Sequence, residues 1–333
     1  MPYAETRVKP KTRDIAHPDG FSSLLEICGR LNFEPHNIAH QLDARGRYEV
    51  ELDREFPFLI KLFHYSSRQH TRGATWHERL ELFMPLDGNA RFQMGEKQVH
   101  LEKGDILVVD NMKLHQVVDF RDFDTRVIVI SFMAEFVHSL GSPSQDYGFL
   151  LPFYSRSDNR PHMLHLSDPD APAVYQAIAR LLSISFEEKD RQFYQIGCKA
   201  FFLEMLYHMA RHFRGSELLK WEFVRQQQRS LRLKPIFDHI SRSYSDKLTV
   251  AEAAGIARMS PPQFMKTFKR VAGMTLIPYI HHVRLSNAVN LLTDTELSIA
   301  EIAARVGFTD QSYFDKRFKA SFGRSPKQFR SSE

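Results

Sequence analysis

Four polar residues in the first half of the chain have side chains that could bind a ligand or an ion. His77, Arg79 and Glu81 occupy every second position, so in a β-strand their side chains would share one face. With His115 added, such a face offers imidazole, guanidinium and carboxylate groups to a polar small molecule. Two histidines and one carboxylate are also the ligand set of non-haem iron sites.

The stretch from about residue 45 to residue 132 has the alternating pattern of short β-strands. Turn signals such as Asp87-Gly88-Asn89, Gly95-Glu96 and Lys103-Gly104-Asp105 separate the runs. Many short strands with hairpin turns indicate a small sandwich or barrel of the jelly-roll type. The strand-like runs are YEVEL, FLIKLFHY, RLELFMPL, ARFQM, KQVHL, DILVVD, HQVVDF and RVIVISF.

Within this stretch, the spacing of several residues resembles the two cupin motifs. His77, Glu81 and Gly88 have the His-x3-Glu-x6-Gly spacing of the first motif. Gly104 precedes His115 by eleven residues, as in the second motif. The segment from about 45 to 135 therefore resembles the cupin sensor domain of AraC-type regulators, which implies that folding brings His115 opposite the strand that carries His77. The candidate effector-binding residues are His77, Arg79, Glu81 and His115.

The match departs from the metal-binding cupin pattern at three positions. Thr75 stands where the first motif begins with a histidine, and Asp110 and Met112 replace the proline and glycine of the second motif. Three interpretations of the polar cluster stay open: a sugar-like or other polar effector, hydrogen bonding that only supports the fold, and a catalytic metal. Because a fourth ligand is missing, we favour the effector and predict no resident metal, no cofactor and no catalytic residue.

The last third of the chain contains an internal repeat. Residues 248–260, LTVAEAAGIARMS, align with residues 297–309, LSIAEIAARVGFT, at a constant offset of 49. After one additional residue, TFKRVAGMT at 267–275 aligns with RFKASFGRS at 317–325 at an offset of 50. A repeat this detailed indicates a duplicated structural unit.

Each copy has the pattern of a helix-turn-helix. Thr249 with Glu252, and Ser298 with Glu301, have the spacing of a capping box at the start of an alanine-rich first helix. Small side chains let the second helix cross close over the first. The expected caps of the second helices are Ser260 and Thr309. The aromatic residues expected to face the core from these second helices are Phe264, Phe268, Phe314 and Phe318.

A further amphipathic helix is predicted between the two units, from Pro278 to Leu292. At about 1.5 Å per residue it is roughly 22 Å long, enough to hold the two second helices about one DNA turn apart. Two helix-turn-helix units joined by such a helix resemble the DNA-binding domain of AraC/XylS regulators over about 230–330. The most telling segments are SIAEIAARVGF and SYFDKRFKASFGRSPKQFR.

The resemblance also implies which side chains contact DNA. The base-reading positions fall on Pro262, Met265, Lys266, Gln311, Ser312, Tyr313 and Lys316, and a small helix rotation would add Gln263. The basic residues assigned to phosphates are Arg258, Lys269, Arg284, Arg317 and Lys319. From Ser230 onward there are 16 Lys+Arg against 9 Asp+Glu, a net of +7, so the whole-chain +5 leaves −2 for residues 1–229. This excess supports double-stranded DNA as the partner.

The remaining segments connect these two parts. Short helices are predicted over 21–31 and 231–243, the latter with a buried stripe of Leu233, Ile236, Phe237 and Ile240. Helices over 171–186 and 192–213 are predicted to form a hairpin. In the AraC type such a pair commonly makes the dimer, which implies a homodimer; an intrachain hairpin is the alternative.

We therefore predict an α+β chain of two domains, an N-terminal cupin-like β-barrel with a helical hairpin and a C-terminal all-α double helix-turn-helix. The expected boundaries are 1–44 for an arm and short helix, 45–165 for the sensor, 166–214 for the hairpin, 215–229 for a linker and 230–333 for the DNA-binding domain. Its two units lie near 248–273 and 297–323.

The predicted function is a sequence-specific, ligand-responsive transcriptional regulator. The resemblance favours an activator, a small polar effector such as a carbohydrate, and RNA polymerase as a further partner. Two distant cysteines, Cys28 and Cys198, and the lack of an apolar signal segment favour a reducing, cytoplasmic location. The alternatives are a cupin-fold metal-dependent enzyme attached to a DNA-binding domain, and a constitutive architectural DNA binder.

Overall fold

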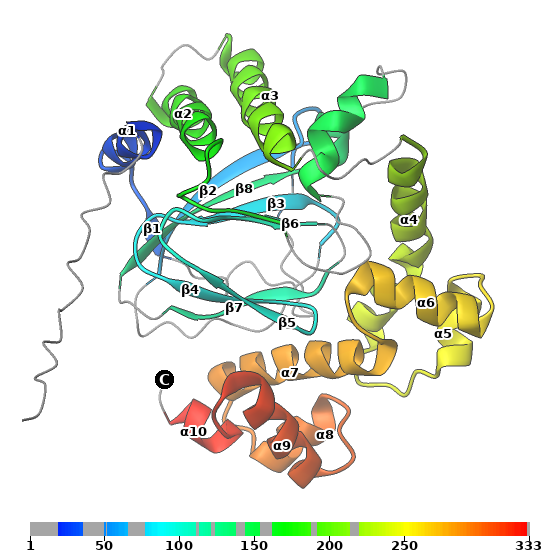
Figure 1. The fold of residues 1–333 in the computed structure, drawn as a ribbon. Coiled ribbons are helices and arrows are strands. Elements are labelled where there is room, and N and C mark those ends of the chain that lie inside the picture. Colours follow the sequence, from blue (N-terminus) through cyan, green and yellow to red (C-terminus); the bar gives the residue numbers. More distant parts are fainter. Residues whose placement is uncertain are drawn as a thin grey trace, which may run out of the picture.

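The computed structural model consists of a β-sandwich covered by helices on one side and followed by a helical C-terminal half (Figure 1). No helix in the described part of the chain is long and apolar enough to cross a membrane. The structure describes residues 19–35, 50, 52–65, 77–110, 113–120, 124–137, 144–153, 162–187, 192–213 and 220–331. Most of the predicted N-terminal arm, the position of Thr75 and that of Met112 lie outside these residues.

The larger sheet has six strands in the order β1-β2-β8-β3-β6-β9. β1 runs parallel to β2, and the other neighbours are antiparallel. Its strands are β1 (Glu34–Pro35), β2 (Phe58–Tyr65), β3 (Leu80–Pro85), β6 (Ile106–Val109), β8 (Thr125–Phe132) and β9 (Met163–Leu164). All six residues of β3 are buried, as expected of a strand that is covered on both faces.

The smaller sheet has the order β5-β4-β7 and packs against the larger one. Its strands are β4 (Ala90–Met94), β5 (Lys97–Leu101) and β7 (His115–Phe120). The core between the sheets includes Phe63, Phe83, Phe92 and Leu107. The predicted sandwich or barrel is thus present as two packed sheets, and seven of the eight predicted strands form. In the YEVEL run, the described residues Val50 and Leu52 lie outside any strand.

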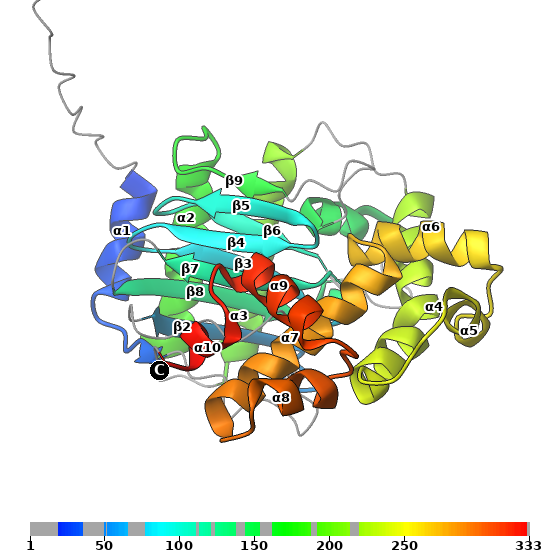
Figure 2. The same ribbon diagram turned by 90° about the horizontal axis from the view of Figure 1, so that it is seen from below.

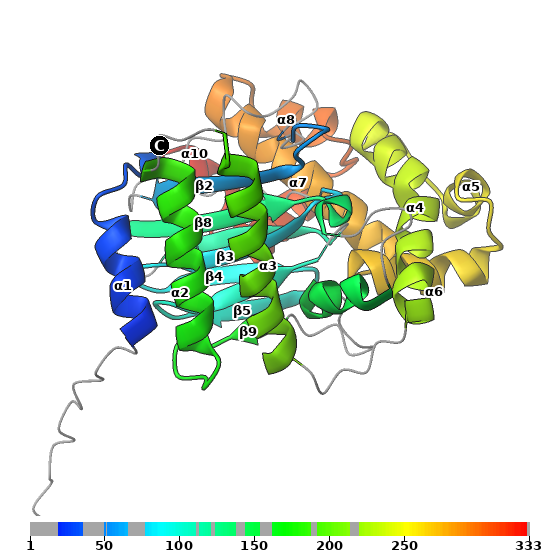
Figure 3. The same ribbon diagram turned by 90° about the horizontal axis from the view of Figure 1, so that it is seen from above.

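Three helices lie side by side over the outer face of the larger sheet (Figure 3). They are α1 (Asp19–Cys28), α2 (Ala171–Leu182) and α3 (Tyr194–His212), and a π-helical turn at Ser183–Glu187 ends α2. Two 3-10 segments, Ala134–Phe136 and Ser144–Phe153, complete this half. Phe202, Met205 and Met209 of α3 are fully buried in the core that this layer shares with the sheet. The predicted hairpin of α2 and α3 is therefore present.

The C-terminal half consists of seven helices among the described residues. They are α4 (Lys220–Ser243), α5 (Val250–Ile256), α6 (Pro261–Ala272), α7 (Leu276–Asp294), α8 (Ile299–Arg305), α9 (Gln311–Phe322) and α10 (Pro326–Arg330). One core is built from α4 to α7 and a second from α7 to α10. α4 begins at Lys220, so it includes much of the segment predicted as a linker, 215–229, and starts well before the helix predicted over 231–243.

The helix starts agree with the sequence patterns except at one cap. Both capping boxes form, Thr249 with Glu252 and Ser298 with Glu301. Ser260 occupies the N-cap of α6 without a side-chain hydrogen bond. The N-cap of α9 is Asp310 rather than Thr309, and Asp310 accepts from the Tyr313 amide at 2.6 Å. The additional residue of the second copy lies at this turn, so the cap moves one position along the chain.

Candidate functional site

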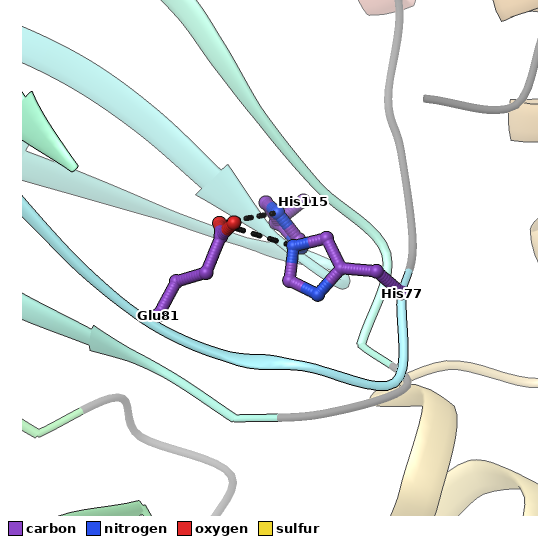
Figure 4. A group of neighbouring side chains, drawn as sticks. All are labelled: His77, Glu81 and His115. Carbon is purple, nitrogen blue, oxygen red and sulfur yellow. Dashed lines mark ion pairs between the residues drawn. The ribbon is translucent and has the colours of Figure 1, made fainter. Parts of the chain in front are cut away.

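His77, Glu81 and His115 converge at one end of the β-sandwich (Figure 4). Glu81 lies in β3 of the larger sheet, His77 just before that strand, and His115 begins β7 of the smaller sheet. Glu81 Oε2 lies 3.0 Å from His77 Nε2 and 3.8 Å from His115 Nε2. One ligand atom from each residue lies within 4.8 Å of the others. The predicted convergence of these residues is confirmed.

Hydrogen bonds fix the orientation of both imidazole rings. His77 Nδ1 lies 2.9 Å from the Arg79 carbonyl oxygen, and His115 Nδ1 lies 2.8 Å from the Lys113 carbonyl oxygen. A carbonyl oxygen can only accept, so each Nδ1 must carry a proton. In a neutral ring, Nε2 then holds a lone pair, and both lone pairs face the Glu81 carboxylate.

The other carboxylate oxygen of Glu81 is held by two donors. Arg79 Nε and Ser131 Oγ each donate to Glu81 Oε1 at 2.7 Å. Ser131 is the residue of β8 that pairs with Glu81 across the sheet. These bonds occupy Oε1 and leave Oε2 for the two histidines. Sequence reasoning missed Ser131, because its role depends on the register of β8 against β3.

Burial and neighbouring charges set the protonation of the site. Burial is the main cause that lowers the pKa of both histidines, and the charges of neighbouring groups are the second. The pKa of His77 is lowered, and that of His115 falls to about 3. Although burial alone would raise the pKa of Glu81, the positive charges beside it, of which the Arg79 guanidinium is the permanent one, hold it well below its usual range. The rings are therefore neutral at pH near 7 while the carboxylate is ionised. His77 Nε2 consequently has a short contact with Glu81 and no hydrogen bond among the described residues.

The site is closed to solvent and flanked by a second buried pair. His77, Glu81 and His115 are 3%, 8% and 7% exposed. Asp110, at the position where the cupin motif has proline, pairs with Lys113 at 2.7 Å, and both are buried. The departure from the cupin pattern therefore adds a buried ion pair beside His115.

The residues next to both histidines contact the C-terminal half. Glu78, adjacent to His77, forms an ion pair with Lys234 of α4. Leu114, adjacent to His115, is 2% exposed and belongs to the hydrophobic core of α4 to α7. At the β4–β5 turn, a Cβ added to Gly95 would lie 3.2 Å from the Gly273 carbonyl oxygen at the end of α6. The residues next to the site histidines, together with the β4–β5 turn, thus contact α4 and the first helix-turn-helix unit.

The predicted base-reading residues belong to α6 and α9, the second helices of the two units, whose places in the fold are shown in Figure 2, and all of them are exposed. Phe264, Phe268, Phe314 and Phe318, which lie on the opposite sides of these helices, are buried as predicted. Met265 and Tyr313 are 50% and 45% exposed despite their apolar surfaces. The exposed positions are Pro262, Gln263, Met265, Lys266, Gln311, Ser312, Tyr313 and Lys316.

Among the basic residues assigned to phosphates, Arg284 has a different environment from the one expected. It donates to four backbone carbonyl oxygens, those of Tyr244, Ser245, Asp246 and Gly307, at 2.6–3.2 Å. The first three carbonyls belong to the end of α4 and its following turn, and the fourth to the turn of the second unit. Arg284 therefore joins the segment after α4 to the turn of the second unit, and its assignment to phosphate stays a prediction. Arg258, Lys269 and Lys319 are exposed, and Arg317 is half-buried.

Both halves of the chain match known domain families. Residues 59–206 match the AraC-like ligand binding domain, and residues 253–332 match a helix-turn-helix domain. The chain belongs to the AraC family of transcriptional regulators. The predicted two-domain α+β architecture and the predicted function as a DNA-binding regulator are confirmed by these matches together with the fold.

Relatives of this AraC-family chain match it over different lengths. The uncharacterized regulator YdeC of Bacillus subtilis is 22% identical over 256 residues, which cover 77% of this chain and 84% of that protein. The arabinose operon regulatory protein of Salmonella typhimurium is 35% identical over 95 residues, 28% of this chain and 33% of that protein. The structure of ToxT from Vibrio cholerae aligns with a TM-score of 0.47 at 16% identity, covering 83% of this chain and 98% of that one.

Proposed function

We propose that this AraC-family regulator changes its DNA binding when a ligand occupies the site formed by His77, Glu81 and His115. The observation that carries the proposal is that the residues next to the two site histidines contact α4 and the core around the first helix-turn-helix unit. Glu78 directly follows His77 in sequence, and Leu114 directly precedes His115. Both Glu78 and Leu114 contact the C-terminal half. A ligand that moves either histidine therefore moves a residue at the contact between the domains.

The response is a shift between arrangements of the two halves. One arrangement presents α6 and α9 to neighbouring turns of the major groove, and the other does not. The ligand shifts the balance only as far as its affinities for the two arrangements differ. No catalytic step is required, and the chain acts as a regulator without enzymatic activity. Its partners are promoter DNA and RNA polymerase, and its place of action is the cytoplasm.

The expected polar effector and activator role rest on the family resemblance. A carbohydrate effector would use Arg79 and the three site residues as hydrogen-bonding groups. In the present arrangement Arg79 is bonded to Glu81, and the three other side chains contact one another. Sugar binding would therefore require these side chains to separate.

A fluorescence anisotropy titration tests the regulatory proposal. The full chain is titrated onto a DNA site selected in vitro, with and without candidate ligands found by thermal shift. His77→Ala should keep specific DNA binding but lose the ligand response, because His77 is buried and is not among the exposed base-reading residues of α6 and α9. His100→Ala, at an exposed histidine of β5, should behave like the natural chain. A response that survives His77→Ala would disprove the assignment of the site.

The homodimer is assigned to an apolar stripe on the outer face of α3. Phe193, Ile196 and Tyr207 are 57%, 67% and 50% exposed. Between them, Ala200 is exposed, and Leu203 is partly buried and packs against the core. The spacing of three and four residues is that of a helix that packs against a second helix. Single exposed apolar residues need no explanation, but a stripe along one helix suits an interface between two copies.

Analytical ultracentrifugation tests the dimer. Ile196→Glu places a charge in the middle of the stripe and should give monomers. Gln195→Glu adds the same charge at an exposed neighbour and should remain dimeric. Monomers in the natural chain, or dimers in Ile196→Glu, would contradict this assignment.

A further inference from the structure

We infer that the ligand of the His77–Glu81–His115 site is a divalent first-row transition-metal ion. The inference deepens the proposed function, on which its regulatory consequence rests. It also reverses the expectation from sequence that no metal is held here. The case depends on the size of the space between the three side chains, on the atoms that face it and on the bonds that hold them.

The space between the three side chains fits one atom. Glu81 Oε2 is 3.0 Å from one imidazole nitrogen and 3.8 Å from the other, and all three ligand atoms lie within 4.8 Å. Two ligands that each lie about 2.1 Å from a shared ion are roughly 3.0–3.4 Å apart. A single ion can therefore bind after small movements, whereas a sugar ring needs the group to open.

The atoms that face this space are electron-pair donors. Each Nδ1 donates to a backbone carbonyl, so each Nε2 presents a lone pair, and Glu81 adds a carboxylate oxygen. His77 Nε2 is buried and makes no hydrogen bond among the described residues. Three converging acceptors repel one another unless a cation lies between them. Two imidazoles and one carboxylate suit Zn²⁺, Fe²⁺ or Co²⁺ rather than Mg²⁺ or Ca²⁺, which prefer oxygen ligands.

The surrounding bonds are those that hold metal ligands in place. The carbonyls of Arg79 and Lys113 bind the far nitrogens of the rings, and Ser131 and Arg79 bind the far oxygen of the carboxylate. Partners of this kind fix ligand orientation in metal sites. Because Arg79 already balances the charge of Glu81, the ion is held less tightly than in a site of several thiolates. Such an exchangeable ion can be sensed.

The ion would join the two sheets at the contact with the DNA-binding half. Glu81 lies in β3 of the six-stranded sheet, and His115 lies in β7 of the three-stranded sheet. Drawing His77 and His115 onto one ion moves the segments that carry Glu78 and Leu114. Metal binding is thereby coupled to the position of α4 and of the first helix-turn-helix unit.

Metal titration of the full chain tests the inference. Protein stripped with a chelator is titrated with Zn²⁺, and with Co²⁺ as a visible-absorption probe of histidine coordination. We expect one ion per chain, with affinity lowered more than about 100-fold in His77→Ala and Glu81→Gln. Ser131→Ala keeps all three ligands and should lower affinity about 10- to 100-fold. His100→Ala controls for exposed histidines and should bind normally. Circular dichroism of the stripped variants shows that each is folded.

The outcomes separate the metal inference from the regulatory proposal. No ion bound, or binding that persists in both His77→Ala and Ser131→Ala, overturns the metal site and leaves regulation by another ligand to be tested by the anisotropy titration. One ion at the site with DNA affinity unchanged upholds the metal site and contradicts its coupling to DNA binding. One ion with a changed DNA affinity, lost in His77→Ala, supports both.

Discussion

Glu78 of the sensor and Lys234 of α4 form an ion pair that joins the two halves of the molecule. The two side chains are 27% and 44% exposed, so the pair is only partly shielded from water. Leu114 makes the apolar part of the same contact, buried in the core of the first helix-turn-helix unit. A residue of the sensor thereby completes the core of the DNA-binding half.

We predict that Leu114→Ala destabilises the first helix-turn-helix unit by about 2–5 kcal/mol, the range for a buried leucine. Hydrogen exchange should show faster opening of α4 and α6. Leu101→Ala removes the same side chain from the core between the sheets and should affect the strands alone. Glu78→Gln should cost less than about 1 kcal/mol, as partly exposed pairs do. Unchanged exchange in α4 for Leu114→Ala would contradict the contact.

Base reading and phosphate contact should separate in DNA titrations. Lys266→Ala and Gln311→Ala should each cost about 1–3 kcal/mol on the cognate site and much less on random DNA, because base contacts discriminate sequence. Lys269→Ala should weaken all DNA alike and reduce the salt slope by about one unit. If Lys266→Ala lost the same affinity on cognate and on random DNA, Lys266 would be assigned to phosphate contact instead of base reading.

The elements with strong local patterns were predictable from sequence, and the contacts between them were not. Capping boxes, the repeated phenylalanines and strand alternation depend on neighbours within a few residues. The role of Ser131 depends on how β8 pairs with β3, and that of Leu114 on how two domains meet. Cupin spacing predicted that His77, Glu81 and His115 converge, but not that both Nε2 atoms face the carboxylate, because backbone carbonyls determine the ring orientation.

Substitutions at equivalent positions in the turns of the two units are predicted to differ in their effect on stability. Arg258 and Gly307 are related by the repeat offset and both have a positive φ, 52° and 90°. Gly307→Ala should cost about 1–3 kcal/mol, because its Cβ would also collide with the Ser245 carbonyl oxygen. Arg258→Gly should change stability by less than about 1 kcal/mol, since relief of backbone strain offsets the added freedom of the unfolded chain. Thermal unfolding of both variants measures the two changes in stability. Equal destabilisation of the two variants would contradict the prediction.

A pH effect is predicted for the helix that joins the units. Burial, and next the charge of Arg317, lower the pKa of His281 and of His282 from 6.5 to about 4. The unfolded chain therefore takes up protons between pH 6.5 and about 4 while the folded chain does not. Stability is highest above pH 6.5 and falls across this window. His282→Leu should reduce the difference between the free energies of unfolding measured at about pH 7 and about pH 5. An undiminished difference would show that His282 is solvated.

Arg284 gives the sharpest test of how the two units are held together. Its planar guanidinium donates to carbonyls at the end of α4 and in the turn before α9, a geometry that a lysine ammonium cannot reproduce. Both Arg284→Met and Arg284→Lys should therefore lose about 1.5–3 kcal/mol of stability, the range for a hydrogen bond to a charged group. The salt slope of DNA binding should stay unchanged in both variants. If Arg284 contacted a phosphate, the lysine variant would keep its DNA affinity and stability, and the methionine variant would lose about one unit of slope. Denaturant unfolding and salt titrations on the same three proteins distinguish these results.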